Sequence, residues 1–147
     1  SSPLNDALTD PRLPFGRSRD FASILPGTIA RRDPDGIVAI DVLGTEMLAI
    51  GHELDPGQEV RVRLVASDVS LAREPATQSS ILNSVPVRIV GIDLIGTAEA
   101  NVRLALPHSG GSGFVARVSR RSVEAMKLRE GETVHAQIKS VSLAASR

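Results

Sequence analysis

The sequence contains no cysteine, tryptophan or tyrosine, and only three phenylalanines among its 147 residues. Without cysteine the chain has neither a disulfide framework nor a thiolate metal site. Aromatic residues make up 2% of the sequence, so it lacks the stacking surface on which single-stranded nucleic-acid binders rely. The 17 basic and 17 acidic residues balance, which leaves no net positive field to attract nucleic acid or an acidic membrane. Apolar runs are all well short of the roughly 20 residues of a membrane-spanning helix. We therefore expect no nucleic-acid partner and no direct membrane insertion.

Sequence motifs for catalysis are also missing. There is no G-x-S-x-G elbow and no phosphate-binding loop of the G-x-x-x-x-G-K-[ST] type. The segment "HSGGSG" (108–113) lacks the lysine and the helix of such a loop, so it predicts a hairpin connection. The three histidines are far apart in sequence, and no carboxylate recurs near them at metal-ligand spacing. We expect no catalytic residue, no metal and no ATP on this chain.

What the chain does contain is a series of short Val/Ile/Leu-rich runs separated by turn signals such as "DPDG" and "LDPG". This pattern is typical of small all-β folds. Residues 1–20 are rich in proline, aspartate and arginine and predict a connector. We expect a first lobe over 21–75 and a second over 76–147, joined by the polar segment "REPATQS".

The two lobes read as copies of one repeat. "SIL" occurs at 23–25 and again at 80–82, 57 residues apart, whereas Gly57 and Gly131, which precede the closing strands, are 74 apart. The second copy is longer by the difference, 17 residues. Its excess includes one short helix, with Ser119 or Ser122 as the cap and Gly131 as the stop. Five or six short strands per lobe predict two tandem small barrels of the OB type.

Hydroxyl and cationic groups gather at the ends of the second-copy elements. Ser80 opens one strand, Ser119 precedes the helix, and Lys139-Ser140 lie inside the closing strand "TVHAQIKSVSLA". A tetrahedral oxyanion has only acceptor atoms, so it requires N–H groups, hydroxyls and a cation of this kind. Ordinary capping and a solvated edge lysine explain the same residues, and the residues alone leave both interpretations open.

Three segments carry a family resemblance: "TQSSILNSVPVRIVGI", "FVARVSRRSVEAMKLREGETVHAQIKSVSL" and "VRVRLVASDVSLA". They resemble the C-terminal accessory domain of molybdate ABC-transporter ATPases, which is a duplicated molybdate-binding (Mop, or TOBE) module. The resemblance is strong over 79–142 and weaker over 21–73. It also extends to the connector, which is similar to the junction that follows the nucleotide-binding domain in those ATPases.

The resemblance implies a set of oxyanion contacts on this chain. They are the opening serine, the next two backbone positions, the hydroxyl residue before the helix, and the Lys-Ser pair: Ser80, Ile81, Leu82, Ser119, Lys139 and Ser140. Many relatives carry arginine at the position of Leu82, so one cation is lost here, and Arg120 or Arg121 are the candidates to replace it. The first copy has Asp68 near the position of the Lys-Ser pair, so we expect that lobe to serve as scaffold.

The resemblance further implies molybdate or tungstate as ligand, and a role in sensing cytoplasmic molybdate and restraining transport. Its implied partners are a second copy of the chain, an ATPase domain and permease subunits, at the cytoplasmic face of the plasma membrane. In the expected dimer, Ser80 and its neighbours come from one chain and Lys139-Ser140 from the other. The alternatives are a free-standing molybdate-storage protein resembling molbindin, a ligand-free TOBE domain of another importer, and a nucleic-acid-binding barrel, which the composition disfavours.

Overall fold

The computed structural model of the protein describes residues 21–51 and 53–145, so the expected connector over 1–20 lies outside the described residues. In this part of the chain, β-strands dominate, and one short helix lies between two of them. In chain order the elements are β1 (Ala22–Arg32), β2 (Ile37–Val42), β3 (Thr45–Ile50), β4 (Glu59–Val65), the 3-10 turn η2 (Ala66–Asp68), β5 (Val69–Ala72), β6 (Asn83–Ile95), β7 (Glu99–Ala105), β8 (Gly113–Ser119), α2 (Arg120–Met126), β9 (Thr133–Ile138) and β10 (Ser142–Ala145).

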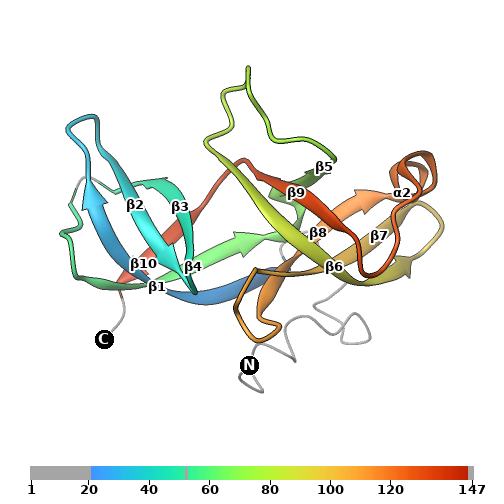
Figure 1. Cartoon of the computed structure of the whole chain (residues 1–147), viewed down its shortest axis with the longest axis horizontal. Helices are drawn as coiled ribbons and strands as arrows, with labels where there is room; N and C mark the ends of the chain where they lie inside the picture. The colour runs from blue at the N-terminus through green and yellow to red at the C-terminus, as the bar shows by residue number, and fades with distance from the viewer. Residues whose placement is uncertain (1–20, 52, 146–147) are drawn as a thin grey trace.

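The strands form two five-stranded antiparallel sheets, one in each lobe (Figure 1). The first sheet has the order β10-β4-β1-β2-β3 and the second the order β5-β9-β6-β7-β8. Strand β4 shows why these residues form sheets: Val60, Val62 and Leu64 are buried, and the charged residues between them face solvent. The predicted all-β fold of two tandem OB-like lobes, with one short helix in the second, is confirmed.

Each half of the chain gives its last strand to the other lobe. Strand β5 leaves the first half and pairs with β9, with Val69 opposite Ile138. Strand β10 leaves the second half and pairs with β4, with Ser142 opposite Arg63. The division into 21–75 and 76–147 stays a prediction about sequence segments, and each sheet contains one strand from across that division.

The strand exchange corrects the expected position of Lys139 and Ser140. The alternating run "TVHAQIKSVSLA" predicts one closing strand, but β9 ends at Ile138 and β10 begins at Ser142. The two residues therefore lie in the crossing between the sheets. The corresponding run of the first half is interrupted in the same way by η2. In both places the strand stops because the chain leaves one sheet for the other.

Sheet register also corrects the alignment of the two copies. Ile29 in β1 and Ile89 in β6 lie at the same irregularity, each just before a bulge, and they are 60 residues apart rather than 57. Asn83 therefore occupies the place of Ser23, and the repeated "SIL" is not structurally equivalent.

Gly91 in the second bulge has no Cβ, and the Arg103 guanidinium fills that space, 2.1 Å from where a Cβ would lie.

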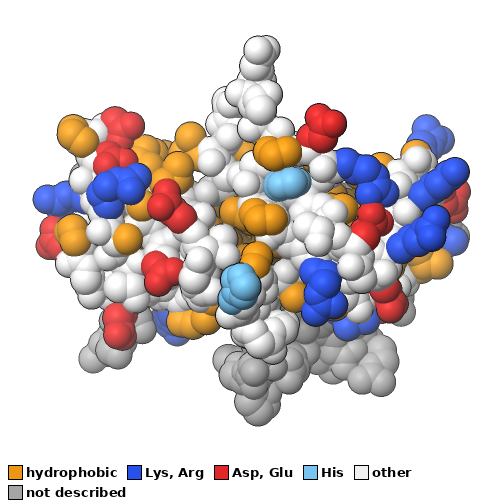
Figure 2. All heavy atoms as spheres, viewed as in Figure 1, with side chains coloured by type: hydrophobic (Ala, Val, Ile, Leu, Met, Phe, Trp, Pro, Cys, Tyr) orange, Lys and Arg blue, Asp and Glu red, His pale blue; other side chains and the backbone are white. Residues whose placement is uncertain are grey.

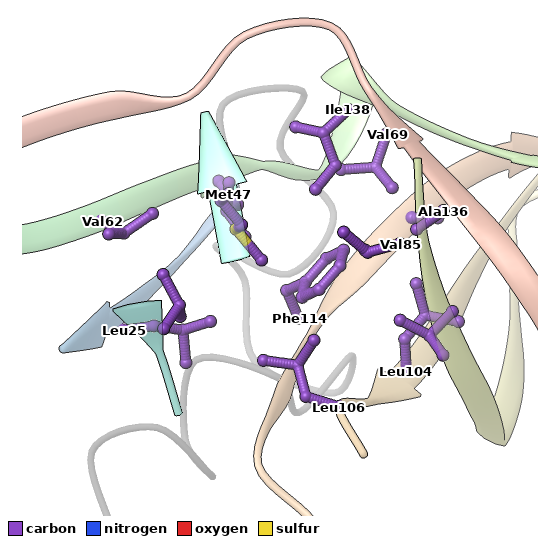
Figure 3. Close-up of a cluster of buried hydrophobic side chains, with 14 of the residues drawn as sticks. Leu25, Met47, Val62, Val69, Val85, Leu104, Leu106, Phe114, Ala136 and Ile138 are labelled. Carbon is purple, nitrogen blue, oxygen red and sulfur yellow. The ribbon is translucent and has the colours of Figure 1, made fainter. Parts of the chain in front are cut away.

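A single hydrophobic core runs through both lobes. Figure 3 shows Leu25, Met47 and Val62 of the first sheet facing Phe114, whose neighbours belong to the second sheet. All four side chains are almost fully buried. Because burial of apolar surface is the main favourable term in folding, this shared core holds the two lobes together. A smaller cluster of Phe21, Ala66 and Val115 packs on the other face of β8.

Helix α2 begins as the sequence predicts and ends earlier. Ser119 is its N-cap, and its Oγ accepts a hydrogen bond from the backbone N–H of Ser122 at 3.0 Å. The helix ends at Met126 because Lys127 takes the left-handed conformation with φ 55°, so Lys127 rather than Gly131 closes it. None of the helices in the described residues is long and apolar enough to span a membrane.

Arg73, directly after β5, ties that strand to the helix end of its lobe. Its guanidinium donates to the carbonyl of Met126 and pairs with the carboxylate of Glu132. The hydrogen bond from Arg73 lowers the pKa of Glu132, and the same bond raises the pKa of Arg73. The exchanged strand β5 is thus held at its end as well as along its ladder.

Candidate oxyanion-binding site

The strand opening, which is the segment 80–82 directly before β6, and the Lys-Ser pair, Lys139-Ser140, lie at the same end of the second sheet. Asn83, the first residue of β6, pairs with Ile138, the last residue of β9. Leu82 and Lys139 directly follow this pair along their own segments, so residues 80–82 and Lys139-Ser140 both extend from the same end of the β6–β9 ladder. Figure 1 shows this place at the centre of the molecule, where the chain crosses from β9 to β10.

Lys139 is an exposed cation whose backbone is fixed. Its N–H donates to the carbonyl of Asp68 at 3.0 Å, which joins the two sheet crossings. Within the described residues its ammonium group has no ion pair and no hydrogen bond. Ser140 is exposed next to it. A positioned ammonium and an adjacent hydroxyl are the groups that an oxyanion requires.

The strand opening supplies fewer donors than the sequence predicts. Ser80 is exposed, and its hydroxyl is available to a ligand. The N–H of Ile81 already donates to Ser79 Oγ at 3.1 Å, so Ser79 occupies one of the two backbone donors expected here. Leu82 is 53% exposed, and its side chain brings apolar surface to the position where relatives carry a cation. The available donors at this opening are therefore the Ser80 hydroxyl and the backbone of Leu82.

Ser119 is not part of this cluster within one chain. It lies opposite Glu99, which pairs with Ile95 at the far end of β6. Its Oγ accepts from the Ser122 N–H and lies 3.0 Å from the Ser122 hydroxyl, so it acts as a helix cap. Figure 1 places α2 at the outer end of the second lobe, away from the central crossing. A second chain would be needed to bring Ser119 to the Lys139 cluster.

The two arginines considered as substitutes for the missing cation share this outer position. Arg120 and Arg121 are the first residues of α2, and Figure 2 shows basic side chains gathered at that end of the molecule. The Arg120 guanidinium donates to the carbonyl of Gly96 at 3.1 Å. Neither arginine therefore replaces the cation missing at Leu82 in the same chain.

Asn83 has a role that the sequence reading did not assign. It is 5% exposed, and its amide oxygen accepts from the Leu48 N–H at 2.7 Å while its amide nitrogen donates to the Leu48 carbonyl at 2.8 Å. Leu48 lies in β3, an edge strand of the other sheet. This two-bond contact fixes the strand opening to the first lobe. The available signal was an asparagine beginning a strand of otherwise alternating apolar residues.

The first copy has a different set of groups at the equivalent places. Ser23 replaces Asn83, and within the described residues its buried hydroxyl has no hydrogen-bond partner. Asp68 ends the first crossing and lies against Lys139 through its carbonyl. A carboxylate here opposes anion binding. As to metals, the described part of the chain has no cluster of three or more His, Asp or Glu that could hold one.

Comparisons with known proteins relate the chain to molybdate transport proteins. Residues 79–145 match the TOBE domain family. A molybdenum import ATP-binding protein ModC from Rhodopseudomonas palustris is 42% identical over 147 residues, covering 99% of this chain and 39% of that protein. The ModC of Pseudomonas aeruginosa is 34% identical, covering 99% and 40%. The chain thus spans about two fifths of the length of these relatives.

A solved structure shares the two-lobe architecture. It is the cytoplasmic molybdate-binding protein ModG in a form with molybdate bound, with a TM-score of 0.70 and 25% sequence identity. The match covers 84% of this chain and 96% of ModG. Together, the TOBE match over the second copy and the match of 99% of this chain to 39% of a ModC protein show that this chain resembles the C-terminal domain of molybdenum import ATP-binding proteins.

Proposed function

We propose that this chain is the oxyanion-binding domain of a molybdate or tungstate import ATPase. The observation that carries the proposal is the pairing of Asn83 with Ile138, because residues 80–82 and Lys139-Ser140 both extend from that end of the β6–β9 ladder. The similarity to ModC proteins and to a ModG structure with molybdate bound supports the choice of ligand. We assign no catalytic residue and no ATP site to the chain.

Each residue of the proposed site contributes a different group to binding a dianion. Lys139 supplies the cation, Ser80 and Ser140 donate from their hydroxyls, and the backbone N–H of Leu82 donates from the strand opening. Ile81 holds the opening in place through the Ser79 contact rather than donating to the ligand. Lys139 offsets one of the two negative charges of the dianion, and burying the remaining net negative charge is costly.

A second copy of the chain would make up this deficit. Ser119 lies too far from Lys139 in its own chain, so a two-fold dimer in which each chain offers Ser119 to the other's cluster completes the set. This pairing differs from the expected one, because Ser80 and Lys139 both follow the same end of the β6–β9 ladder within one chain, whereas Ser119 does not. Ligand and dimerisation are then linked, and saturating molybdate should shift sedimentation toward the dimer. A chain that binds molybdate fully as a monomer would contradict the shared site.

In the whole protein, we propose that anion binding here senses cytoplasmic molybdate and restrains transport. The domain would act on the ATPase domain and the permease subunits at the cytoplasmic face of the plasma membrane. The support is the similarity to ModC proteins, of which the chain matches about two fifths.

Isothermal titration of the chain with molybdate, tungstate, sulfate and phosphate tests the ligand assignment. We expect saturable binding of molybdate and tungstate, and much weaker binding of sulfate, which is smaller. Equal binding of all four anions would reduce the site to a general positive charge. The absence of any binding would favour the ligand-free domain of another importer, an alternative to which the apolar Leu82 points.

A free-standing molybdate-binding protein is the second alternative. The observation that favours it is the match over 96% of ModG, which shows that a protein of this two-lobe size exists without an ATPase domain. The two functions are separated by asking whether molybdate binding changes ATP hydrolysis by the full-length transporter.

A further inference from the structure

The second lobe carries a groove that is separate from the oxyanion cluster. It lies between β6, the start of β9 and the connection from β7 to β8, and its volume is about 360 Å³. Its polar lining includes Arg88, His108 and Thr133, and its exposed apolar lining includes Pro86 and Pro107. Arg88 is five positions into β6 from Asn83, so the groove lies farther along the strand than the cluster at 80–82.

The first lobe has a groove at the equivalent place, and its charge is the opposite. In β1, Thr28 is flanked by Asp41 of β2 and Glu59 of β4. These three residues line a groove of about 280 Å³ that begins at Pro26, as the other begins at Pro86. The first-lobe groove thus presents two carboxylates and no cation.

At each of the three equivalent positions, the second lobe has a residue that favours an anion more than its first-lobe counterpart does. In β6, Arg88 holds the place of Thr28 and is flanked by Ala105 of β7 and Thr133 of β9. A cation stands where the first lobe has a neutral threonine, and neutral residues stand where the first lobe has two carboxylates. Within the described residues Arg88 has no ion-pair partner, so its charge is unopposed. An exposed, unpaired guanidinium is a preferred partner of carboxylate and phosphate groups.

The β7–β8 connection forms one wall of the groove and is held in a defined conformation. The Ser109 hydroxyl lies within hydrogen-bond distance of the Leu106 carbonyl at 2.7 Å and the Ser112 carbonyl at 2.9 Å. His108, Gly110 and Gly111 have positive φ, and the two glycines adopt it without the cost of a side chain. Backbone N–H groups of such turns, together with the His108 imidazole, are additional donors on the rim.

From this charge reversal and the apolar lining, we propose that the second-lobe groove binds a small organic anion. The class is an apolar ring or chain that carries one carboxylate or phosphate group. Arg88 and the Thr133 hydroxyl bind the anionic group, and the exposed rings of Pro86 and Pro107 contact the apolar part. The volume is that of a small-molecule site. An inorganic oxyanion has no apolar part, so it would use only one half of this groove.

The test uses phenyl phosphate as the probe, with benzyl alcohol as its uncharged counterpart and inorganic phosphate as its headgroup alone. Amide chemical shifts of the ¹⁵N-labelled chain are followed during each titration. We expect saturable shifts at Arg88, Gly110 and Thr133 with phenyl phosphate, and no shifts at Thr28 or Glu59. Both controls should bind at least several-fold more weakly. Equal shifts in the two lobes, or equal binding of phenyl phosphate and either control, would overturn the proposal.

A matched pair of variants tests the named residue. Arg88→Thr introduces the first-lobe residue and should weaken phenyl phosphate binding roughly tenfold or more. Arg63→Thr changes an exposed arginine of β4 and should leave it unchanged. Preserved amide spectra outside the groove show that each variant is folded. If Arg88→Thr binds phenyl phosphate as the parent chain does, the groove is not an Arg88 site.

The test of the groove gives a result that is independent of the test of molybdate binding. Molybdate titration of Arg88→Thr should match that of the parent chain, because Arg88 is outside the Lys139 cluster. Phenyl phosphate binding without molybdate binding would keep this inference and remove the proposed function, and the reverse result would do the opposite.

Discussion

Lys139 and Lys127 are both exposed lysines of the second copy, and only one of them lies where an anion is expected. Lys139 is in the crossing between the sheets, beside the strand opening, whereas Lys127 ends α2. A charge-assisted contact contributes roughly 1.5–3 kcal/mol, so Lys139→Ala should weaken molybdate binding about ten- to a hundredfold in isothermal titration. Lys127→Ala is the control and should leave the affinity unchanged. Similar losses in both variants would show that Lys139 is only a surface charge.

Asp68 is the residue whose removal should improve the site. Its carbonyl accepts from the Lys139 N–H, so Asp68 ends the first crossing directly against the second, where a carboxylate opposes a dianion. Removing one negative charge that solvent partly screens should make the free energy of molybdate binding more favourable by about 0.5–1 kcal/mol. Asp68→Asn should therefore tighten molybdate binding roughly two- to fivefold. The gain should shrink at high salt. Glu130→Gln, an exposed carboxylate after α2, is the control. An unchanged affinity in Asp68→Asn would show that this carboxylate points away from the ligand.

At the residue scale, the sequence predicts a local role better than a distant one. Ser119 as a helix cap follows from its place before Ser122 and is confirmed, because both partners lie within one turn. The contact between Asn83 and Leu48 was not predictable, because Leu48 is 35 positions away and belongs to the other lobe. For the same reason, the sequence could not show that Ser119 lies far from Lys139. The grouping of 80–82 with Lys139-Ser140 as oxyanion contacts stays a prediction.

At the scale of elements, the pair of bonds from Asn83 to β3 is the direct polar link between the strand opening and the first lobe. Asn83→Ala would leave the N–H and carbonyl of Leu48 without this partner, at a cost of about 1–3 kcal/mol in the free energy of unfolding. Urea unfolding measures this loss. Ser23→Ala is the internal control: it removes an equivalent buried hydroxyl that makes no bond, so it should be neutral or slightly stabilising. Equal destabilisation by both changes would show that packing rather than hydrogen bonding matters at this position.

Strand positions follow from alternation, but the sheet to which a strand belongs does not. The run "RVRLVASDVSLAR" over 61–73 is similar to the closing run of the second copy and predicts one strand in the same way. The structure divides it into β4 and β5, in different sheets, with η2 between them. Alternation specifies that one face of a strand is buried, and any sheet edge with an apolar face satisfies that requirement. The exchange of β5 and β10 was therefore beyond the reach of the sequence pattern.

For the whole molecule, the shared core and the exchanged strands predict that both lobes unfold together. Met47 is fully buried in the first lobe, and Met47→Ala should cost about 2–5 kcal/mol. Hydrogen exchange should report the same loss for amides of β2 in the first lobe and of β7 in the second, because each lobe contains a strand of the other. Loss of protection in β2 with β7 unaffected would show that the lobes are independent domains.

The pairing of β10 with β4 also bears on how the chain folds as it is made. Arg63 of β4 leaves the ribosome 79 residues before Ser142, the residue with which it pairs. Until then the open edge of β4 has no covering strand, although the rest of its sheet has been translated. A sheet edge in this state is a site for pairing with another nascent chain. Contacts so distant in sequence also slow folding, so the first lobe to be synthesised cannot be the first to be completed.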